Sequence, residues 1–298
     1  MDHLDLTNDS RTTMNSGVRS VQIHDDERDV IFTCVVQYPT LTDTSSTTIG
    51  PYAFDATLNA PIAAGQFPIC LVSHGGGGSH LLYRSIGTHL SKNGYIVIAL
   101  EHFGDNRNDR SLADTDAGAE LRPRHAVLTL DTVLGDPFFK SAGDSKQVAV
   151  LGHSMGGYTA LALIGGQPYS RSARKLAVKA DPRFRAAVLL APATDWYRAP
   201  GSLNNVTAPV LVIAGERDSV TRPEDIRETL SPLLENDPSQ MIVVPDAGHF
   251  SFLAPFPAHM RRNDFPPSSD PEGFNREQFH LILPERILGF LNRTLITR

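Results

Sequence analysis

The sequence predicts an α/β fold with a mostly parallel, twisted sheet, antiparallel strands at its N-terminal side and helices on both faces. Three observations lead to this. From Phe67 onward, short apolar runs alternate with helix-like stretches, as where helices join parallel strands. Val18–Ile23 and Val30–Tyr38, separated by a charged turn, have the pattern of an antiparallel pair. The apolar run at 148–151 meets a glycine-rich turn, and helix-forming residues 158–164 follow.

The composition indicates a globular protein with a sizeable core. Of 298 residues, 41% are hydrophobic and 20% are charged. We find no internal repeat or linker, which predicts one domain over residues 18–298 after a flexible tail at 1–17. A formal net charge of −6 without a basic stripe disfavours nucleic acid as a partner. The oligomeric state is left open. Cys34 and Cys70 are expected to be buried free thiols, with one disulfide as the alternative.

No apolar run reaches the roughly 18 residues that a membrane span needs. The polar start of the chain lacks the apolar centre of a signal peptide, which predicts a cytoplasmic protein unless a signal was removed from a precursor.

The first third of the chain supplies the first strands. Residues 39–50 are rich in Ser and Thr and predict a loop, and residues 51–66 predict a surface connection. Phe67–Ser73 is short and apolar throughout, which is typical of a strand buried on both faces. Residues 81–93 predict a helix that a glycine stops. The apolar run Tyr95–Leu100 is the next buried strand.

The remaining chain continues the alternation after a polar excursion at 107–124. Strands are predicted at the apolar runs Phe184–Leu190, Val210–Ala214 and Met241–Pro245, and helices at 126–134, 224–234 and 278–293. Thr221 is predicted to cap the second of these helices, Pro232 to kink or shorten it, and Pro284 to interrupt or restart the last. Residues 252–274 are aromatic and proline-rich, which predicts a small cap built from loops.

The glycine-rich turn carries the first chemical signal. It reads Gly152-His153-Ser154-Met155-Gly156, a G-x-S-x-G motif between a predicted strand and a predicted helix, which is the context that such a motif requires. So tight a turn forces the serine into a strained conformation, and the glycines avoid collisions. The hydroxyl is then held at the positive end of a helix. An ordinary glycine-rich turn is the alternative.

Four consecutive glycines, Gly75–Gly78, follow the strand at 67–73. They allow backbone N–H groups to face a cleft, as in oxyanion loops of the H-G-G-G type. A flexible linker is the alternative, but linkers seldom follow a buried strand directly. The N–H groups of Gly76 and Met155 are therefore predicted to bind a developing oxyanion.

Three side chains are predicted to form a catalytic triad at the carboxyl edge of the sheet. Ser154, Asp218 and His249 each lie just past a predicted strand, so they can meet although they are far apart in the chain. His249 would take the serine proton, and Asp218 would orient the imidazole. Glu216 is a rival acid. Asp218 is preferred because it lies further beyond its strand.

Five further residues are predicted to contact the substrate. His102 follows a buried strand, where α/β folds place ligands. Trp196, the only tryptophan, and Tyr197 follow another strand and are expected to wall the pocket. Phe250 and Phe252 come directly after His249. For all five, a structural or packing role is the alternative.

Four motifs in this order resemble the α/β-hydrolase superfamily, and within it the bacterial dienelactone-hydrolase-like group, which is related to the platelet-activating-factor acetylhydrolases. They are residues 73–78 (SHGGGG), 101–106 (EHFGDN), 152–157 (GHSMGG) and 248–255 (GHFSFLAP). The resemblance covers about residues 18–298. It implies hydrolysis of carboxylic esters, often with short acyl groups, without metal or cofactor. Dienelactone hydrolases proper have a cysteine where Ser154 stands, and no membrane-binding surface helix is obvious, so neither the enol-lactone nor the phospholipid substrate is carried over.

Three hypotheses follow. The first is a serine esterase that cleaves a small apolar or short-acyl ester through an acyl-enzyme, so its expected partner is a small-molecule ester. The second is an amidase or peptidase that uses the same triad. The third is a ligand-binding protein of this fold without turnover, against which a complete triad argues.

Overall fold

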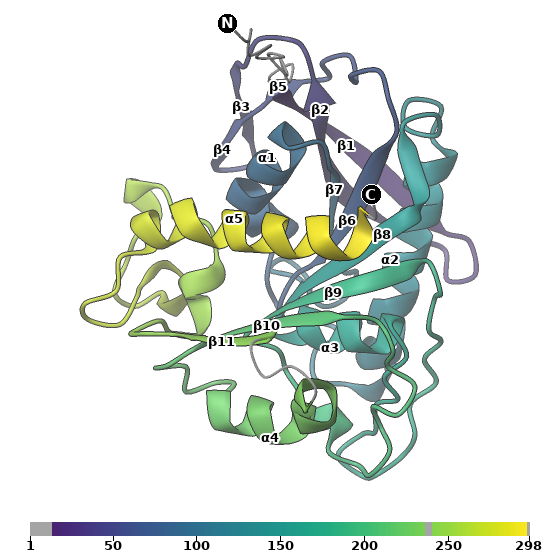
Figure 1. Ribbon diagram of the computed structural model, residues 1–298, viewed down its shortest axis with the longest axis vertical. Coiled ribbons are helices and arrows are strands. Elements are labelled where there is room, and N and C mark those ends of the chain that lie inside the picture. The colour runs from purple at the N-terminus through teal and green to yellow at the C-terminus, as the bar shows by residue number, and fades with distance from the viewer. Residues whose placement is uncertain (1–13, 236–239, 297–298) are drawn as a thin grey trace, which may run out of the picture.

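The computed structural model describes residues 14–235 and 240–296, and its α/β architecture confirms the predicted fold class (Figure 1). The strands of the main sheet are β1 (Asn15–Asp25), β2 (Val30–Thr40), β5 (Thr57–Leu58), β6 (Phe67–Ser73), β7 (Ile96–Leu100), β8 (Gly143–His153), β9 (Phe184–Leu190), β10 (Val210–Gly215) and β11 (Met241–Val244). Their order is β11-β10-β9-β8-β6-β7-β2-β1-β5. β2 pairs antiparallel with β1 and β7, whereas β7, β6, β8, β9, β10 and β11 pair in parallel.

Helices cover both faces of the sheet (Figure 1). One face carries α2 (Asp116–Gly135), α3 (Met155–Leu163) and α4 (Pro223–Leu234), and the other carries α1 (Arg84–Lys92) and α5 (Arg276–Leu295). Alternate side chains of β6 enter the two cores: Ile69 and Leu71 join one, and Cys70 and Val72 join the other. Because both faces are buried, the strand is apolar throughout. Both cysteines are buried and free, as expected.

The parallel strands set the place of the site. β6, β8, β10 and β11 all run in the same direction, so the loops that follow them lie at one edge of the sheet. The loops after β6, β8 and β11 carry three of the four motifs, with the predicted oxyanion residues, Ser154 and His249, and the loop after β10 carries Asp218. The fourth motif, residues 101–106, follows β7, which runs in the same direction. The topology alone therefore brings those residues to one edge.

The N-terminal part is more regular than predicted. β1 already begins at Asn15, so the predicted boundary at residue 17 falls inside a strand, and residues 1–13 lie outside the described part of the chain. The predicted loop and connection at 39–66 contain a two-stranded hairpin of β3 (Ser46–Ile49) and β4 (Tyr52–Asp55). Buried and exposed residues alternate over only four positions of β4, where Tyr52 and Phe54 are the buried ones. So short a pattern is easy to miss in the sequence.

Helix α2 begins ten residues earlier than predicted and contains Pro123. The Thr115 hydroxyl caps it by accepting the Gly118 N–H at 2.9 Å. Pro123 has no N–H, which deprives the Ala119 carbonyl of its helical partner. The buried Tyr158 hydroxyl of α3 donates to that carbonyl at 3.1 Å. The helix thus tolerates its proline through a tertiary contact.

Two other predictions about helix prolines are also corrected. α4 runs to Leu234 through Pro232, because the Ser231 hydroxyl donates at 2.9 Å to the Glu228 carbonyl that the proline leaves free. α5 is continuous through Pro284. Thr221 does not cap α4, whose N-cap is Arg222.

The cap predicted at 252–274 is irregular chain. Its only regular pieces within the described residues are three-residue and four-residue 3₁₀ turns, η4 (His249–Phe252), η5 (Ala258–Met260) and η6 (Pro266–Ser268).

Candidate active site

Ser154 alone makes the turn between β8 and α3, since β8 ends one residue before it and α3 begins one residue after it. Its backbone has φ 54° and ψ −119°, a strained conformation for a residue with a side chain. A Cβ on Gly152 would overlap the Gly156 carbonyl, and a Cβ on Gly156 would overlap the Ser73 carbonyl of β6. Close backbone packing therefore requires both glycines of the motif.

The structure brings Ser154, His249 and Asp218 into one hydrogen-bonded chain. The His249 Nε2 lies 3.0 Å from the Ser154 Oγ, and the His249 Nδ1 lies 2.8 Å from the Asp218 Oδ2. Because a carboxylate only accepts, Nδ1 carries the proton and Nε2 is free to accept from the serine. Ser154 is partly exposed, whereas the other two side chains are buried.

Asp218 is held as an anion. Burial by itself would raise its pKa, but hydrogen bonds from His249 and Thr221 outweigh that effect and bring the pKa below its usual range. The Thr221 hydroxyl donates to Oδ2 at 2.8 Å, and the N–H groups of Val220 and Thr221 both donate to Oδ1 at 2.8 Å. Thr221 thus donates hydrogen bonds to the Asp218 carboxylate and does not cap α4. Glu216, the rival acid, is exposed and accepts the N–H of Asp246 at 3.0 Å.

The glycine loop leaves one N–H group unused. Three others have partners: Gly75 donates to the Tyr83 hydroxyl at 3.4 Å, Gly77 to the Asp105 Oδ1 at 2.9 Å, and Gly78 to the Gly75 carbonyl at 3.0 Å. Within the described chain, the N–H groups of Gly76 and of Met155, the first residue of α3, have no hydrogen-bond partner. Both predicted oxyanion donors are therefore free to bind an oxyanion.

His153, next to the serine, braces the site. Its Nε2 lies 2.9 Å from the backbone carbonyl of His249, and its Nδ1 lies 3.0 Å from the Tyr83 hydroxyl. Since a carbonyl only accepts, Nε2 carries the proton and Nδ1 accepts from Tyr83. Burial, with a smaller effect of His249, lowers the pKa of His153 to about 3, so the ring is neutral. This contact joins the serine turn, the histidine loop and, through Tyr83, the glycine loop.

A cavity of about 600 Å³ opens over Ser154. Most of its wall is apolar. The apolar side chains come from the hairpin, from the 3₁₀ turn η1 (His80–Tyr83) before α1, from η4 and from the cap segment: Tyr52, Leu82, Phe250, Leu253, Phe256, Met260 and Phe265. Arg107, Arg110 and Asp114 stand at its polar side. The arrangement can hold a small substrate with an apolar group beside the serine.

Of the five predicted substrate contacts, only Phe250 lines this cavity. His102 is fully buried with its Nε2 2.8 Å from the Ser73 hydroxyl. Trp196 and Tyr197 pack on Tyr158, with ring centroids 5.3 Å and 5.7 Å away. Phe252 is fully buried and packs on an aromatic ring of α5. In this structure the four side chains make packing and hydrogen-bond contacts inside the fold, the alternative that proximity to the core already offered.

Sequence reasoning missed several residues around the site. No pattern in the sequence singles out Tyr83 or Arg122, and Asp105 stands out only as part of the motif at 101–106. Tyr52 was placed in a surface connection. The alternation of Tyr52 and Phe54 was a usable signal, but only the tertiary contacts show what Tyr83 and Arg122 bind.

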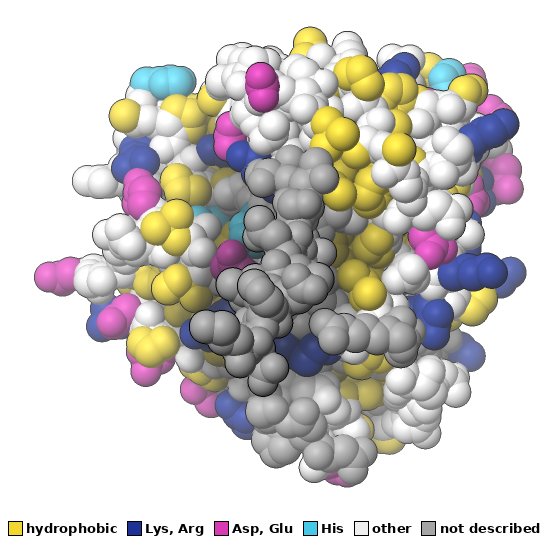
Figure 2. All heavy atoms as spheres, turned by 45° about the horizontal axis from the view of Figure 1, so that its top comes forward, with side chains coloured by type: hydrophobic (Ala, Val, Ile, Leu, Met, Phe, Trp, Pro, Cys, Tyr) yellow, Lys and Arg dark blue, Asp and Glu magenta, His cyan; other side chains and the backbone are white. Residues whose placement is uncertain are grey.

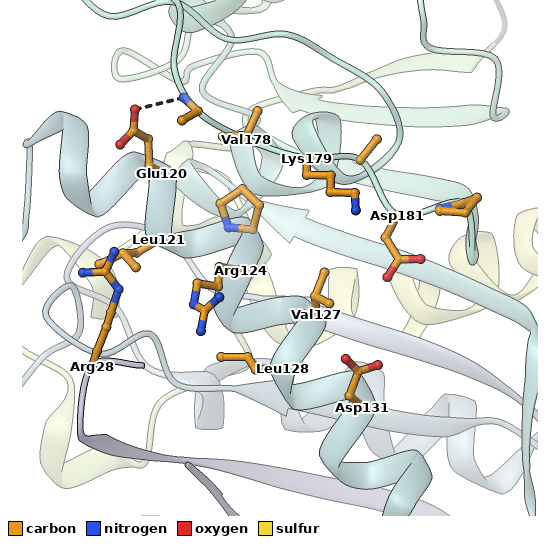
Figure 3. A pocket seen from close by; sticks show the side chains of 14 residues that line it. Arg28, Glu120, Leu121, Arg124, Val127, Leu128, Asp131, Val178, Lys179 and Asp181 are labelled. Carbon is orange, nitrogen blue, oxygen red and sulfur yellow. Dashed lines mark hydrogen bonds between the residues drawn. The ribbon is translucent and has the colours of Figure 1, made fainter. Parts of the chain in front are cut away.

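A second hollow of about 650 Å³ lies between α2 and residues 177–182 (Figure 3). Val127 and Leu128 contribute an apolar floor, and the Glu120 carboxylate accepts the Ala177 N–H at 2.9 Å. No serine, cysteine or histidine lines it, so it lacks the side chains of a serine or cysteine hydrolase.

Across residues 14–235 and 240–296, no group of three or more His, Cys, Asp or Glu side chains could hold a metal ion. None of the helices described is long and apolar enough to cross a membrane. On the coloured part of the face in Figure 2, acidic and basic side chains are mixed.

A family model described as the alpha/beta hydrolase fold matches residues 68–196, which include the glycine loop and the serine turn. The platelet-activating factor acetylhydrolase of Canis lupus familiaris is 24% identical, over 68% of this chain and 52% of its own length. A cutinase of Thermobifida alba is 26% identical, over 55% of this chain and 46% of its own. The chain thus spans about half the length of these curated relatives.

Solved structures share the fold. A ferulic acid esterase from Streptomyces cinnamoneus superposes with a TM-score of 0.71 at 18% identity, covering 95% of this chain and 91% of the other. A putative dipeptidyl aminopeptidase IV from Bacteroides ovatus superposes with a TM-score of 0.58 at 15% identity, with 95% and 36% covered. At such identities, the likeness concerns the fold alone.

Proposed function

We propose, from the premise that this chain is an α/β hydrolase, that it is a serine esterase which cleaves small carboxylic esters through an acyl-enzyme. The observation that carries the proposal is the continuous contact from Asp218 through His249 to Ser154, beside two unused N–H groups. The names of the acetylhydrolase and the cutinase support an ester substrate.

The first half-reaction forms the acyl-enzyme. The Ser154 oxygen attacks the ester carbonyl while His249 takes the hydroxyl proton at Nε2. The tetrahedral oxyanion is bound by the N–H groups of Gly76 and Met155, where loss of one donor typically costs about 3–4 kcal/mol of transition-state stabilisation. Asp218, anionic at neutral pH, stabilises the imidazolium that forms. The C–O bond then breaks, and the imidazolium proton passes to the departing alcohol.

The second half-reaction hydrolyses the acyl-enzyme and regenerates the free enzyme. Water attacks the acyl carbonyl, and His249 takes the water proton as it earlier took that of serine. The same two N–H groups bind the second oxyanion. When the bond to Ser154 breaks, the proton returns to the serine oxygen and the carboxylic acid leaves.

The segment 252–274 is proposed to act as a cap on the single domain at 18–298. Three of its side chains, Leu253, Phe256 and Phe265, line the cavity over the serine. An apolar wall of this size favours a small apolar or short-acyl group over a strongly charged one.

Burst kinetics test the proposal. The enzyme should release p-nitrophenol from a short-chain p-nitrophenyl ester in a burst that matches the enzyme concentration, because p-nitrophenolate leaves readily and acylation should then be faster than deacylation. The matching p-nitroanilide separates esterase from amidase, since an amide additionally requires protonation of a leaving nitrogen. Binding of the ester without release of p-nitrophenol would favour a ligand-binding protein, and equal rates on ester and anilide would favour an amidase.

A further inference from the structure

We infer that Asp105 and Arg122 are positioning residues which hold the glycine loop so that the Gly76 N–H faces the developing oxyanion. The inference rests on the proposed function, since it assigns these two side chains a part in the same reaction. Neither side chain would touch the substrate. Both would act through the backbone of the glycine loop.

Asp105 connects the loop to a buried cation. Its Oδ1 accepts the Gly77 N–H at 2.9 Å, and its Oδ2 accepts the Arg122 Nη1 at 2.7 Å. The aspartate is 6% exposed and the arginine 1% exposed. A pair this deeply buried loses its hydration, so it rarely adds net stability over an apolar pair of the same shape. Its place beneath the loop therefore needs another explanation.

Arg122 reaches the loop at a second point. Its Nη2 donates to the His74 carbonyl, and its Nε donates at 3.1 Å to the Thr159 hydroxyl of α3. One guanidinium thus binds the chain before the four glycines, the helix that starts at the serine turn, and the aspartate that binds Gly77. The loop is positioned against α2 and α3, which are rigid elements.

The contacts lie on both sides of Gly76. Gly75 is bound through its N–H to Tyr83, and Gly77 is bound through its N–H to Asp105. Glycine peptides rotate easily, and Gly77 already has φ 59°. Without Asp105, the peptide between Gly76 and Gly77 loses the bond that sets its orientation. The Gly76 N–H lies on the preceding peptide, whose carbonyl accepts the Gly78 N–H at 3.0 Å within the same loop. A loop released from Asp105 would therefore shift this N–H together with its local partner, and the donor would lose the preorganisation that makes it effective.

A second ion pair, whose aspartate is buried while its arginine side chain is 31% exposed, offers a control on the same helix. Asp25 is 1% exposed and accepts the Arg124 Nη2 at 2.7 Å. Arg124 is on the same helix as Arg122, but this pair ties β1 to α2 and does not line the cavity over Ser154. Loss of either aspartate should lower stability. Only loss of Asp105 should also weaken transition-state binding.

The experiment compares Asp105→Ala, Asp105→Asn and Asp25→Ala in the full chain. For a short p-nitrophenyl ester, Asp105→Ala should lower kcat about 10- to 100-fold with KM changed less than about twofold. Affinity for an arylboronic acid, which mimics the tetrahedral state, should fall by a similar factor. Asp105→Asn keeps an acceptor oxygen for Gly77 but loses the charge that holds Arg122, so its kcat and boronate affinity should fall by more than about twofold but by less than in the alanine variant. Asp25→Ala should lower the melting temperature and leave kcat within about twofold.

The inference is overturned if Asp105→Ala and Asp25→Ala lose similar stability and both retain the kcat and boronate affinity of the natural protein. If Asp105→Ala does not fold, Asp105→Asn decides, because unchanged kcat and unchanged boronate affinity in that variant contradict a positioning role. Full activity of Ser154→Ala would instead contradict the proposed serine-esterase function. This result distinguishes failure of the proposed function from failure of the positioning role.

Discussion

Ser154 combines a strained backbone, a neighbouring base and two unused N–H groups. Each of these features is held by residues other than the serine side chain. The positive φ is held by close packing of Gly152 and Gly156. The base is set by the hydrogen bonds of His249. A small change of side chain at this position should therefore affect chemistry far more than folding.

Ser154→Ala is expected to abolish burst and turnover with little change in melting temperature, since alanine removes only the hydroxyl. A serine-directed phosphonate should add its mass to the natural protein on the peptide that contains Ser154, and should not add it to the variant. Mass spectrometry and a p-nitrophenyl ester assay check both results. Appreciable hydrolysis by the variant, or labelling on another peptide, would refute the nucleophile.

Asp218→Asn should lower kcat by about 10⁴-fold, because the amide cannot hold the imidazole in the tautomer that accepts from serine. Glu216→Gln is the matched control, since Glu216 is exposed and binds only the loop at Asp246. It should leave kcat within about twofold. A large loss in the glutamine variant with a small loss in the asparagine variant would show that the wrong acid was named.

At the scale of elements, α2 shows how a tertiary contact compensates for a local defect. Pro123 removes the helical partner of the Ala119 carbonyl, and the Tyr158 hydroxyl replaces it. Tyr158→Phe should therefore lower the free energy of unfolding by about 1–3 kcal/mol, since it leaves a buried carbonyl without a partner. Urea denaturation measures the change.

Pro123→Ala provides the control for that prediction, because it restores an N–H to the helix. In the Pro123→Ala background, the cost of Tyr158→Phe should fall to a small fraction of its value alone. An equal cost in both backgrounds would mean that the tyrosine acts through packing and not through this hydrogen bond.

At the scale of the whole molecule, five buried histidines couple stability to pH. Burial, the leading cause for each, lowers the pKa of His125 and His153 to about 3 and of His280 to about 4, and brings the pKa of His74 and His102 well below the usual range. The folded protein keeps all five neutral at pH 5. The unfolded chain takes up protons on them below about pH 6.5.

Stability should therefore fall as the pH decreases from about 6.5, by up to about 1.4 kcal/mol per pH unit for each histidine, until the folded pKa values are reached. Asp218, whose pKa is lowered, loses its contribution only below about pH 4. Calorimetry at pH 5 in buffers of different ionisation enthalpy should detect an uptake of about five protons on unfolding. An uptake near zero would contradict neutral histidines in the folded state.

Much of this molecule is determined by the sequence itself. Continuous apolar runs identify β6, β7 and β9 almost to the residue, because strands buried on both faces need no alternation. The G-x-S-x-G turn, the four glycines and the position of Asp218 and His249 after strands are local patterns. Parallel pairing then brings them to one edge, so the candidate triad and its two N–H donors follow from sequence order and topology.

Tertiary structure alone decides what depends on distant partners. The Tyr158 hydroxyl reaches the carbonyl that Pro123 leaves free on another helix, and Trp196 packs on the ring of Tyr158. The contacts of Asp105, Arg122 and Tyr83 with the glycine loop also join segments that are separated in the chain. A sequence shows which groups need partners, but the free energy that selects those partners comes from packing in three dimensions.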